Sequence, residues 1–313
     1  MKRISIALCV IFTVAAGAAV AGSNTTYNFL RSDVGARAAA LGGSFISMTD
    51  DPVSIFYNPS ALATLSSTQV SFGFFKHLLD INSGYASYGQ EVADLGHIGA
   101  GIVYVNYGEF TRTDELGNKL GTFSANELAL SVGYASELMP RVKYGANLKF
   151  IYSQIAEAAS SAMAIDLGAL YKFDEPRLMV GFSLLNLGTQ LDPYLSTRES
   201  LPVDFKIGAT IEPEHVPVLL NLNFHHLNET ESDFVGRFRA FSVGAEFTVS
   251  EEIQLRAGYN NERRRELKIG SSTGLAGFSL GAGVMFDQYK VDYAFNSYGT
   301  IGSLHRVSVG IAF

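Results

Sequence analysis

The chain has 313 residues, enough for one large or two ordinary domains, and its 23 basic and 30 acidic residues give a net charge of −7. This acidic balance argues against nucleic-acid binding, which requires a basic face. The single cysteine, Cys9, lies in a segment that we expect to be removed, so the mature chain is expected to have no disulfide and no thiolate chemistry.

The first 21 residues have the features of a secretory signal peptide. Lys2 and Arg3 precede an apolar stretch, and the small residues 19–21 fit a cleavage site. An uncleaved N-terminal anchor is the alternative, but the apolar run is marginal for a spanning helix. We therefore expect residues 1–21 to direct export and to be cleaved, which leaves 21 basic against 30 acidic residues.

Residues 22–66 show no strand-like alternation, and they contain two predicted helix starts. Asp51 can cap a helix that has Pro52 at its first position, and Asn58 can do the same with Pro59. A residue before proline is restricted to extended conformations, as a helix cap requires. We expect this segment to form a hatch, and a periplasmic extension is the alternative.

From residue 67 to the end, apolar and polar residues alternate with the period of two that is typical of strands with two different faces. In the last strand, Val307 and Val309 share one face, while Arg306 and Ser308 share the other. Most segments reach the about 9–11 residues that a tilted strand needs to cross a bilayer. We expect fourteen strands, at 67–77, 81–90, 96–107, 124–135, 141–153, 161–173, 177–188, 202–211, 216–226, 237–250, 253–260, 277–286, 289–296 and 304–313.

The gaps between these segments alternate between long and short, apart from the first gap. Short periplasmic turns and longer outer loops are typical of barrels in the outer membrane. A soluble β-sandwich or propeller is the alternative for an exported, glycine- and aromatic-rich chain, but it has no reason to alternate its gaps. The sequence therefore predicts an all-β protein, a 14-stranded antiparallel transmembrane β-barrel over residues 67–313, surrounded by outer-membrane lipid.

A barrel of this width is too wide for its own side chains to fill. Several residues expected to face the lumen are also small, namely Gly133, Gly145, Gly168, Ser242, Gly244 and Gly310. Both features favour a hatch, residues 22–66, that folds inside the lumen as a plug.

The mature chain resembles the PorV/PorQ family along its whole length. The resembling stretches include "NFLRSDVGARAAALGGSF", "VNYGEFTRTDELGNKLGTFSANE" and "VDYAFNSYGTIGSLHRVSVGIAF". In addition, "NPSAL" at residues 58–62 resembles the NPA box in the hatch of FadL-like barrels, with Ser60 in place of alanine. The resemblance implies a non-enzymatic outer-membrane component of the type IX protein secretion system, with PorZ-, PorU- and PorV-like partners. The terminal Phe313 resembles the C-terminal aromatic residue that the barrel assembly machinery reads.

Two other functions stay open on the sequence. A FadL-like transporter of small hydrophobic molecules would need an apolar lumen pocket and an inward kink in a strand. Gly96, Gly99 and Gly101 would permit such a kink in the third predicted strand. A structural, porin-like protein is the third interpretation.

No motif predicts an enzyme, a cofactor or a metal site. His225 and His226 are adjacent at a predicted strand end, where neighbours point to opposite faces, so we do not expect them to share one metal ion. Arg263, Arg264 and Arg265 lie in a predicted outer loop. We expect a solvated loop there, with contact to lipopolysaccharide or to a protein partner as the alternative, because arginine suits phosphate and carboxylate.

Overall fold

The computed structural model describes residues 25–77, 81–175, 177–229, 236–267 and 274–313. The predicted signal peptide, residues 1–21, and the first three residues of the predicted hatch lie outside the described residues. Within the described part of the chain, no helix is long and apolar enough to cross a membrane.

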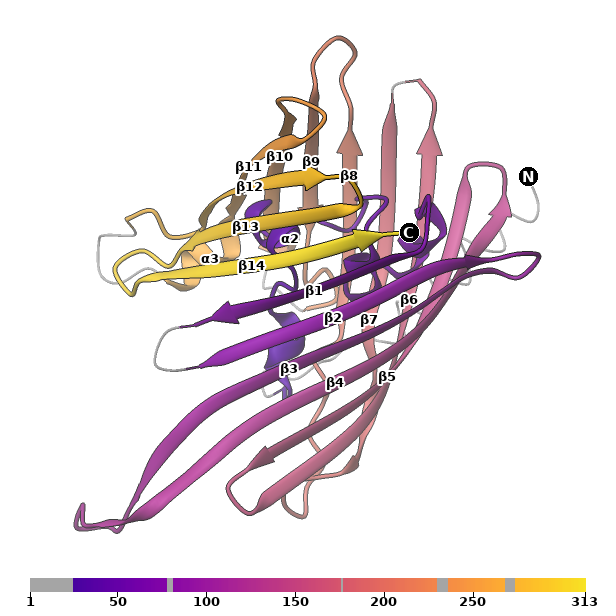
Figure 1. The fold of residues 1–313 in the computed structure, drawn as a ribbon. Helices are drawn as coiled ribbons and strands as arrows, with labels where there is room; N and C mark the ends of the chain where they lie inside the picture. Colours follow the sequence, from indigo (N-terminus) through magenta and orange to yellow (C-terminus); the bar gives the residue numbers. More distant parts are fainter. Residues whose placement is uncertain (1–24, 78–80, 176, 230–235, 268–273) are drawn as a thin grey trace.

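The chain forms one closed barrel of fourteen antiparallel strands, as predicted (Figure 1). The last strand pairs with the first, with Gln69 opposite Ala312, so the sheet has no free edge. Each predicted segment overlaps one strand. The strands are β1 (Gln69–Lys76), β2 (Asn82–Val92), β3 (Gly96–Thr113), β4 (Lys119–Met139), β5 (Val142–Ile155), β6 (Ala158–Phe173), β7 (Leu178–Asp192), β8 (Asp204–Ile211), β9 (Val218–Phe224), β10 (Phe241–Thr248), β11 (Ile253–Asn260), β12 (Phe278–Phe286), β13 (Tyr289–Ser297) and β14 (Ser303–Ala312).

Two of the predicted long gaps are wrong, because strands occupy most of them. β3 and β4 continue pairing past a bulge after Asn106 as far as the pair Thr113 and Lys119. β5 and β6 are joined only by residues 156–157. The long connections that remain are β7–β8, β9–β10 and β11–β12, and all three lie at one end of the barrel, called here the long-loop end.

The outward and inward faces of the wall have opposite polarity. Leu148, Leu167 and Val307 point outward, each with at least 40% of its surface exposed. Between such residues, Lys149 and Asp166 point into the lumen and are buried. An apolar outer face with charged residues inside is the arrangement of a barrel that is embedded in lipid.

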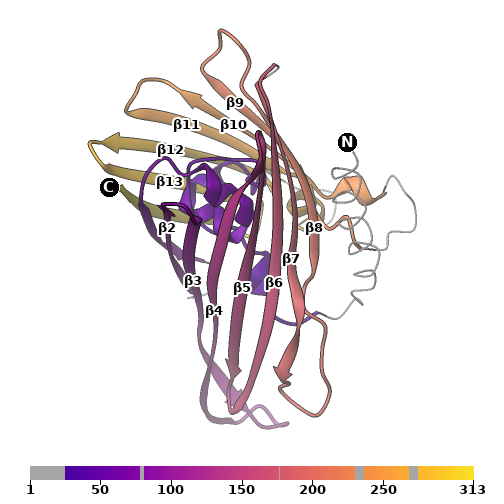
Figure 2. The same cartoon turned by 90° about the vertical axis from the view of Figure 1, so that its right-hand side faces the viewer.

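Residues 25–66, called here the inner segment, lie against the inside of the wall (Figure 2). Thr25 forms a bridge with Ser200 at the long-loop end, and the segment finishes beside the start of β1 at the opposite, short-turn end. Its elements are η1 (Asn28–Arg31), α2 (Ala36–Ala40), η2 (Pro52–Phe56) and η3 (Pro59–Thr64). α2 contacts β11–β14, and η3 contacts β2–β6.

Glycines in the wall let the inner segment approach the strand backbone. A Cβ atom at Gly145 would lie 2.6 Å from the backbone of Pro59 and Ser60. Glycines of β10 and β11 meet the end of α2 in the same way, with a Cβ at Gly244 placed 2.9 Å from the carbonyl oxygen of Leu41. Gly310 does not belong to this set, because its nearest neighbour would be 3.7 Å away.

A cluster of buried ion pairs holds α2 at the short-turn end. Arg37 binds Glu246 at 2.7 Å and Asp51 at 3.2 Å. Arg256 binds Glu246 at 2.6 Å and Asp292 at 2.7 Å, and Lys290 lies 3.9 Å from Asp292. Three cations thus face three carboxylates, so the charges in this cluster are balanced. Removing one member would leave a buried charge without its counterion.

Candidate functional site

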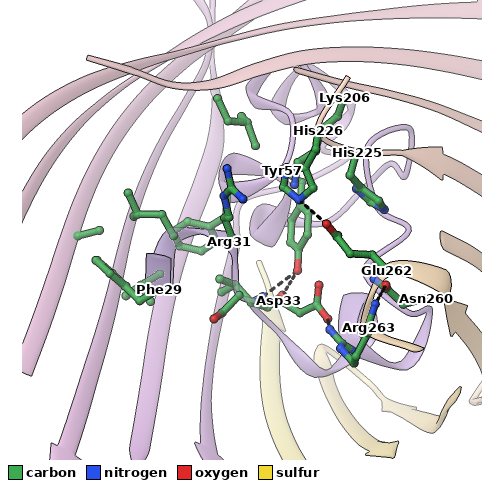
Figure 3. A pocket seen from close by; sticks show the side chains of 18 of the residues that line it. Phe29, Arg31, Asp33, Tyr57, Lys206, His225, His226, Asn260, Glu262 and Arg263 are labelled. Carbon is green, nitrogen blue, oxygen red and sulfur yellow. Dashed lines mark hydrogen bonds and ion pairs between the residues drawn. The ribbon is translucent and has the colours of Figure 1, made fainter. Parts of the chain in front are cut away.

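A cavity of 190 Å³ lies between the inner segment and the wall at the long-loop end (Figure 3). Its apolar side is formed by Phe29, Phe56, Val103, Ala129 and Leu185. Its polar side carries charged groups from the inner segment, from β5 and β8, from the β9–β10 connection and from the short helix α3 (Asn261–Glu266). A ligand here would meet an apolar surface on one side and charges on the other.

His226 connects three of the elements around the cavity. Its Nδ1 lies 3.3 Å from Asp204 of β8, and its Nε2 lies 3.3 Å from Glu262 of α3. Burial opposes the charge on His226, but these two carboxylates outweigh burial and raise its pKa to about 9. The protonated ring therefore ties the β9–β10 connection to the wall and to α3 at neutral pH.

The adjacent His225 has the opposite environment. Its Nε2 lies 2.8 Å from the hydroxyl of Ser242, and burial, together with the charge of Lys206, lowers its pKa to about 4. His225 is therefore neutral at neutral pH. Both histidines line the cavity, so the expectation that they point to opposite faces is wrong. β9 ends at Phe224, and His226 has a positive φ of 54°, so strand alternation does not extend to them.

Asp33 connects the inner segment to α3. Its carboxylate binds the guanidinium of Arg263 at 2.7 Å. Burial opposes the charge on Asp33, but Arg263 and Arg306 outweigh it and hold the pKa of this carboxyl below its usual range. The hydroxyl of Tyr57 closes the adjacent turn, accepting from the amide of Val34 at 2.7 Å and donating to its carbonyl at 2.9 Å.

Two further spaces adjoin the cavity, and Phe29 lines all three. One is an open groove of 580 Å³ at the long-loop end, whose aromatic lining is Tyr27, Phe29, Tyr107, Phe110, Phe123 and Tyr194. The other is a smaller cavity of 140 Å³ beside Phe75 and His77. The long-loop half of the lumen is therefore hollowed.

The two predicted helix starts are present as N-caps in the inner segment. The Asp51 carboxylate accepts from the amide of Val53 at 3.0 Å, and Pro52 follows it. The Asn58 side chain accepts from the amide of Ser60 at 3.2 Å, donates to the carbonyl of Ile46 at 2.8 Å, and precedes Pro59. Both helices are short 3₁₀ turns.

The predicted outer-loop arginines do not act as a set. Arg263 is directed at Asp33 and packs over the ring of Tyr298, so the expectation of a solvated or partner-binding side chain is wrong for it. Arg265 is exposed, and Arg264 is half-buried, and their contact with lipopolysaccharide or a partner stays a prediction. Phe313 is exposed, and its role as an assembly signal also stays a prediction.

Sequence reasoning missed most of the charged residues around the cavity. Asp33 and Arg263 are 230 positions apart, and no local spacing relates them. Lys149 did carry a signal, because it is a charged residue on the lumen parity of its strand. Within the described ranges, no group of three or more histidine, cysteine or acidic residues could hold a metal ion.

Comparison with known proteins shows the fold. No protein-family model matches the chain, and no curated protein matches it in sequence. Among solved structures, the Pseudomonas putida toluene transporter TodX matches 89% of this chain and 98% of its own, at 13% identity and a TM-score of 0.59. The Ralstonia pickettii toluene transporter TbuX matches 89% and 97%, at 10% identity and a TM-score of 0.59. A Pseudomonas aeruginosa FadL homologue matches 90% and 98%, at 10% identity and a TM-score of 0.55.

The chain therefore has the fold of FadL-like fourteen-stranded barrels. The FadL-like part of the sequence resemblance is confirmed at the level of fold. The narrower resemblance to the PorV/PorQ family receives no support from these comparisons. The similar structures are transporters and channels rather than enzymes.

Proposed function

We propose that this protein is a non-enzymatic outer-membrane barrel that carries small molecules with an apolar part across the membrane, as a FadL-like transporter. The observation that carries this proposal is the hollowed long-loop half of the lumen, where an aromatic groove adjoins the 190 Å³ cavity at Phe29. Aromatic faces supply apolar contact for a molecule that enters from outside. The similarity in fold to toluene transporters supports the same function.

The inner segment controls passage in this proposal. Below the cavity, η3 packs against the glycines of the wall, and the Asn58 amide group binds the carbonyls of Ile46 and Ala169. A solute in the cavity can reach the short-turn end only if part of the segment moves. Transport is therefore expected to depend on how firmly the segment is held.

An opening through the wall at β3 finds no support in the structure. β3 keeps one register with β2 and with β4 from residue 97 to residue 106, so the kink expected at its glycines does not interrupt either ladder. Gly99 and Gly101 instead lie under Leu62 and Phe56 of the inner segment. We propose a route along the lumen, past the segment.

The test is uptake of labelled toluene by proteoliposomes that contain the purified protein. Asn58→Ala removes the cap and the hydrogen bonds to the carbonyls of Ile46 and Ala169, and loss of an N-cap alone costs about 0.5–2 kcal/mol. We expect the wild type to raise uptake above empty liposomes and Asn58→Ala to change the rate. Asn118→Ala, in the exposed β3–β4 turn, is the matched control and should behave as the wild type.

The same measurement separates transport from the secretion function that the sequence resemblance implies. An anchor for PorZ-, PorU- or PorV-like partners requires no uptake. Background uptake by every variant, together with release of type IX cargo or PorZ-like partners from cells that lack the protein, would replace our proposal with that function.

A further inference from the structure

Two hollow parts of the lumen approach each other along β1 and β2. One is the 140 Å³ cavity at the long-loop end, which extends to Phe75 of β1 and to Val34 of the inner segment. The other is a pocket of 400 Å³ at the short-turn end, which begins at Ser71 of β1 and at Arg37 of the inner segment. A single inward-facing position of β1, Gly73, lies between the two spaces on this strand.

Tyr85 of β2 fills the lumen at this level. It is paired with Gly73, and only 5% of its surface is exposed. Its ring takes the space that a side chain at Gly73 would need, because a Cβ there would lie 2.5 Å from the ring carbon Cε1. Three of the four inward-facing positions next to this pair are serines, at 71, 83 and 87. Their side chains are too short to fill the same space, so the ring of Tyr85 separates the cavity from the pocket.

The ring of Tyr85 is held both by the wall and by the inner segment. Phe75 of β1 stacks on it with the ring centres 5.7 Å apart, and its hydroxyl is hydrogen-bonded to the hydroxyl of Ser71 at 2.7 Å. On the other side, Phe56 of η2 meets it edge-on at 6.3 Å. Since Phe56 belongs to the inner segment, a movement of η2 frees one side of the ring.

The inner segment passes this level with two small residues, Gly35 and Ala36. A Cβ at Gly35 would lie 3.5 Å from the hydroxyl of Tyr85, and the amide of Ala36 donates to the hydroxyl of Ser308 at 2.9 Å. Neither residue has a side chain that could replace the ring. Removal of the Tyr85 ring would therefore connect the long-loop cavity with the short-turn pocket.

From this arrangement, we propose that Tyr85 is the gate of the lumen, and that a solute passes along β1 and β2 when its ring turns aside. The faces of Phe75 and Phe56 then supply apolar contact to the passing molecule in place of the ring. This inference rests on the proposed function, because it names the route of the transporter and the residue that controls it.

The test is the planar-bilayer conductance of the purified protein with side chains of decreasing size at this position. Tyr85→Phe keeps the ring and should conduct as the wild type does. Tyr85→Ala should raise the mean conductance about tenfold or more, because it opens the constriction that limits the flow of ions, and Tyr85→Leu should lie between them. Tyr88→Ala, on the outward face of the same strand, is the matched control and should conduct as the wild type does.

Gel mobility before and after heating shows which variants form the barrel. A folded Tyr85→Ala variant with the conductance of the wild type would overturn the gate. If this variant does not fold, equal conductance of Tyr85→Leu and Tyr85→Phe would overturn it instead.

Uptake of labelled toluene by proteoliposomes separates the gate from the proposed function. Raised conductance of Tyr85→Ala without toluene uptake by any variant would support the gate and reject the proposed class of solute. Toluene uptake by the wild type, with equal conductance in all folded Tyr85 variants, would support transport and reject the gate.

Discussion

Replacing Gly145 with alanine should displace the inner segment without changing the barrel. The added Cβ would lie 2.6 Å from the backbone carbon of Pro59 and from the amide nitrogen of Ser60, where ordinary contact begins at 3.4 Å. These are backbone atoms, so no side chain can rotate away. The start of η3 must therefore retreat by about 0.8 Å, the difference between these two distances.

The energy of this displacement follows from three contributions. Overpacking a close contact costs about 1–3 kcal/mol, and the cap bond from Ser60 to Asn58 that is lost adds about 0.5–2 kcal/mol. Alanine is better than glycine in a strand interior by about 0.5–1 kcal/mol, which offsets part of the loss. A net cost of about 2 kcal/mol raises the population of displaced segments about 30-fold.

Planar-bilayer conductance measures this population directly. Gly145→Ala should open far more often than the wild type, while Gly310→Ala, whose new Cβ would meet nothing closer than 3.7 Å, should not. Gel mobility before and after heating checks that both variants form the barrel. If a folded Gly145→Ala variant has the conductance and toluene uptake of the wild type, the inner segment does not close the lumen through this contact.

Three further predictions concern the wall and the loops. Val243→Arg on the lipid face should cost about 2–4 kcal/mol of folding free energy and should reduce the intensity of the folded, heat-modifiable band on a gel. Leu116→Arg in the exposed β3–β4 turn should leave this band unchanged. Equal losses of the folded band in the two variants would refute the assigned faces. The pKa of His226 is raised from 6.5 to about 9, so its stabilising contribution is complete below pH 6.5 and is lost as pH rises through 9. Hydrogen exchange in α3 should therefore increase between pH 7 and pH 10, after correction for the intrinsic rate, and His226→Gln should abolish this dependence. Glu246→Ala leaves two buried arginines without their shared partner and should cost about 3–5 kcal/mol in urea unfolding, while Glu212→Ala, from an exposed pair, should cost almost nothing.

The number of strands was predictable because lipid and lumen impose opposite requirements on alternate residues. Leu167 and Asp166 are neighbours in sequence, and one is exposed while the other is fully buried. The same reasoning failed in the β3–β4 hairpin. There the strand pairing continues through polar residues such as Glu109 and Arg112. The two faces of this stretch do not differ enough in polarity to show the alternation of a strand.

The candidate site was less predictable, because its partners come from distant parts of the chain. Asp51 and Asn58 each accept a hydrogen bond from the amide two residues further along the chain, so the sequence pattern of an N-cap was enough to predict them. Asp33 and Arg263 meet only after the barrel closes. The three consecutive arginines, 263–265, appeared in the sequence to form one cluster. The side chain of Arg263, however, points into the lumen, because α3 places this position over the cavity.

The two halves of the inner segment are held by different forces, and this difference determines which half is expected to move. Residues 36–66 are held by balanced ion pairs and by backbone packed against wall glycines. A small displacement of the segment would weaken both interactions sharply. Residues 25–34 are held by the bridge from Thr25 to Ser200, by buried rings such as Tyr27, and by ion pairs to loop residues, such as Asp33 to Arg263. Residues 29–34 line the cavity, so a solute that enters it contacts this half directly. Solute entry is therefore expected to displace residues 25–34 first, while the short-turn half stays closed until the solute has left the groove.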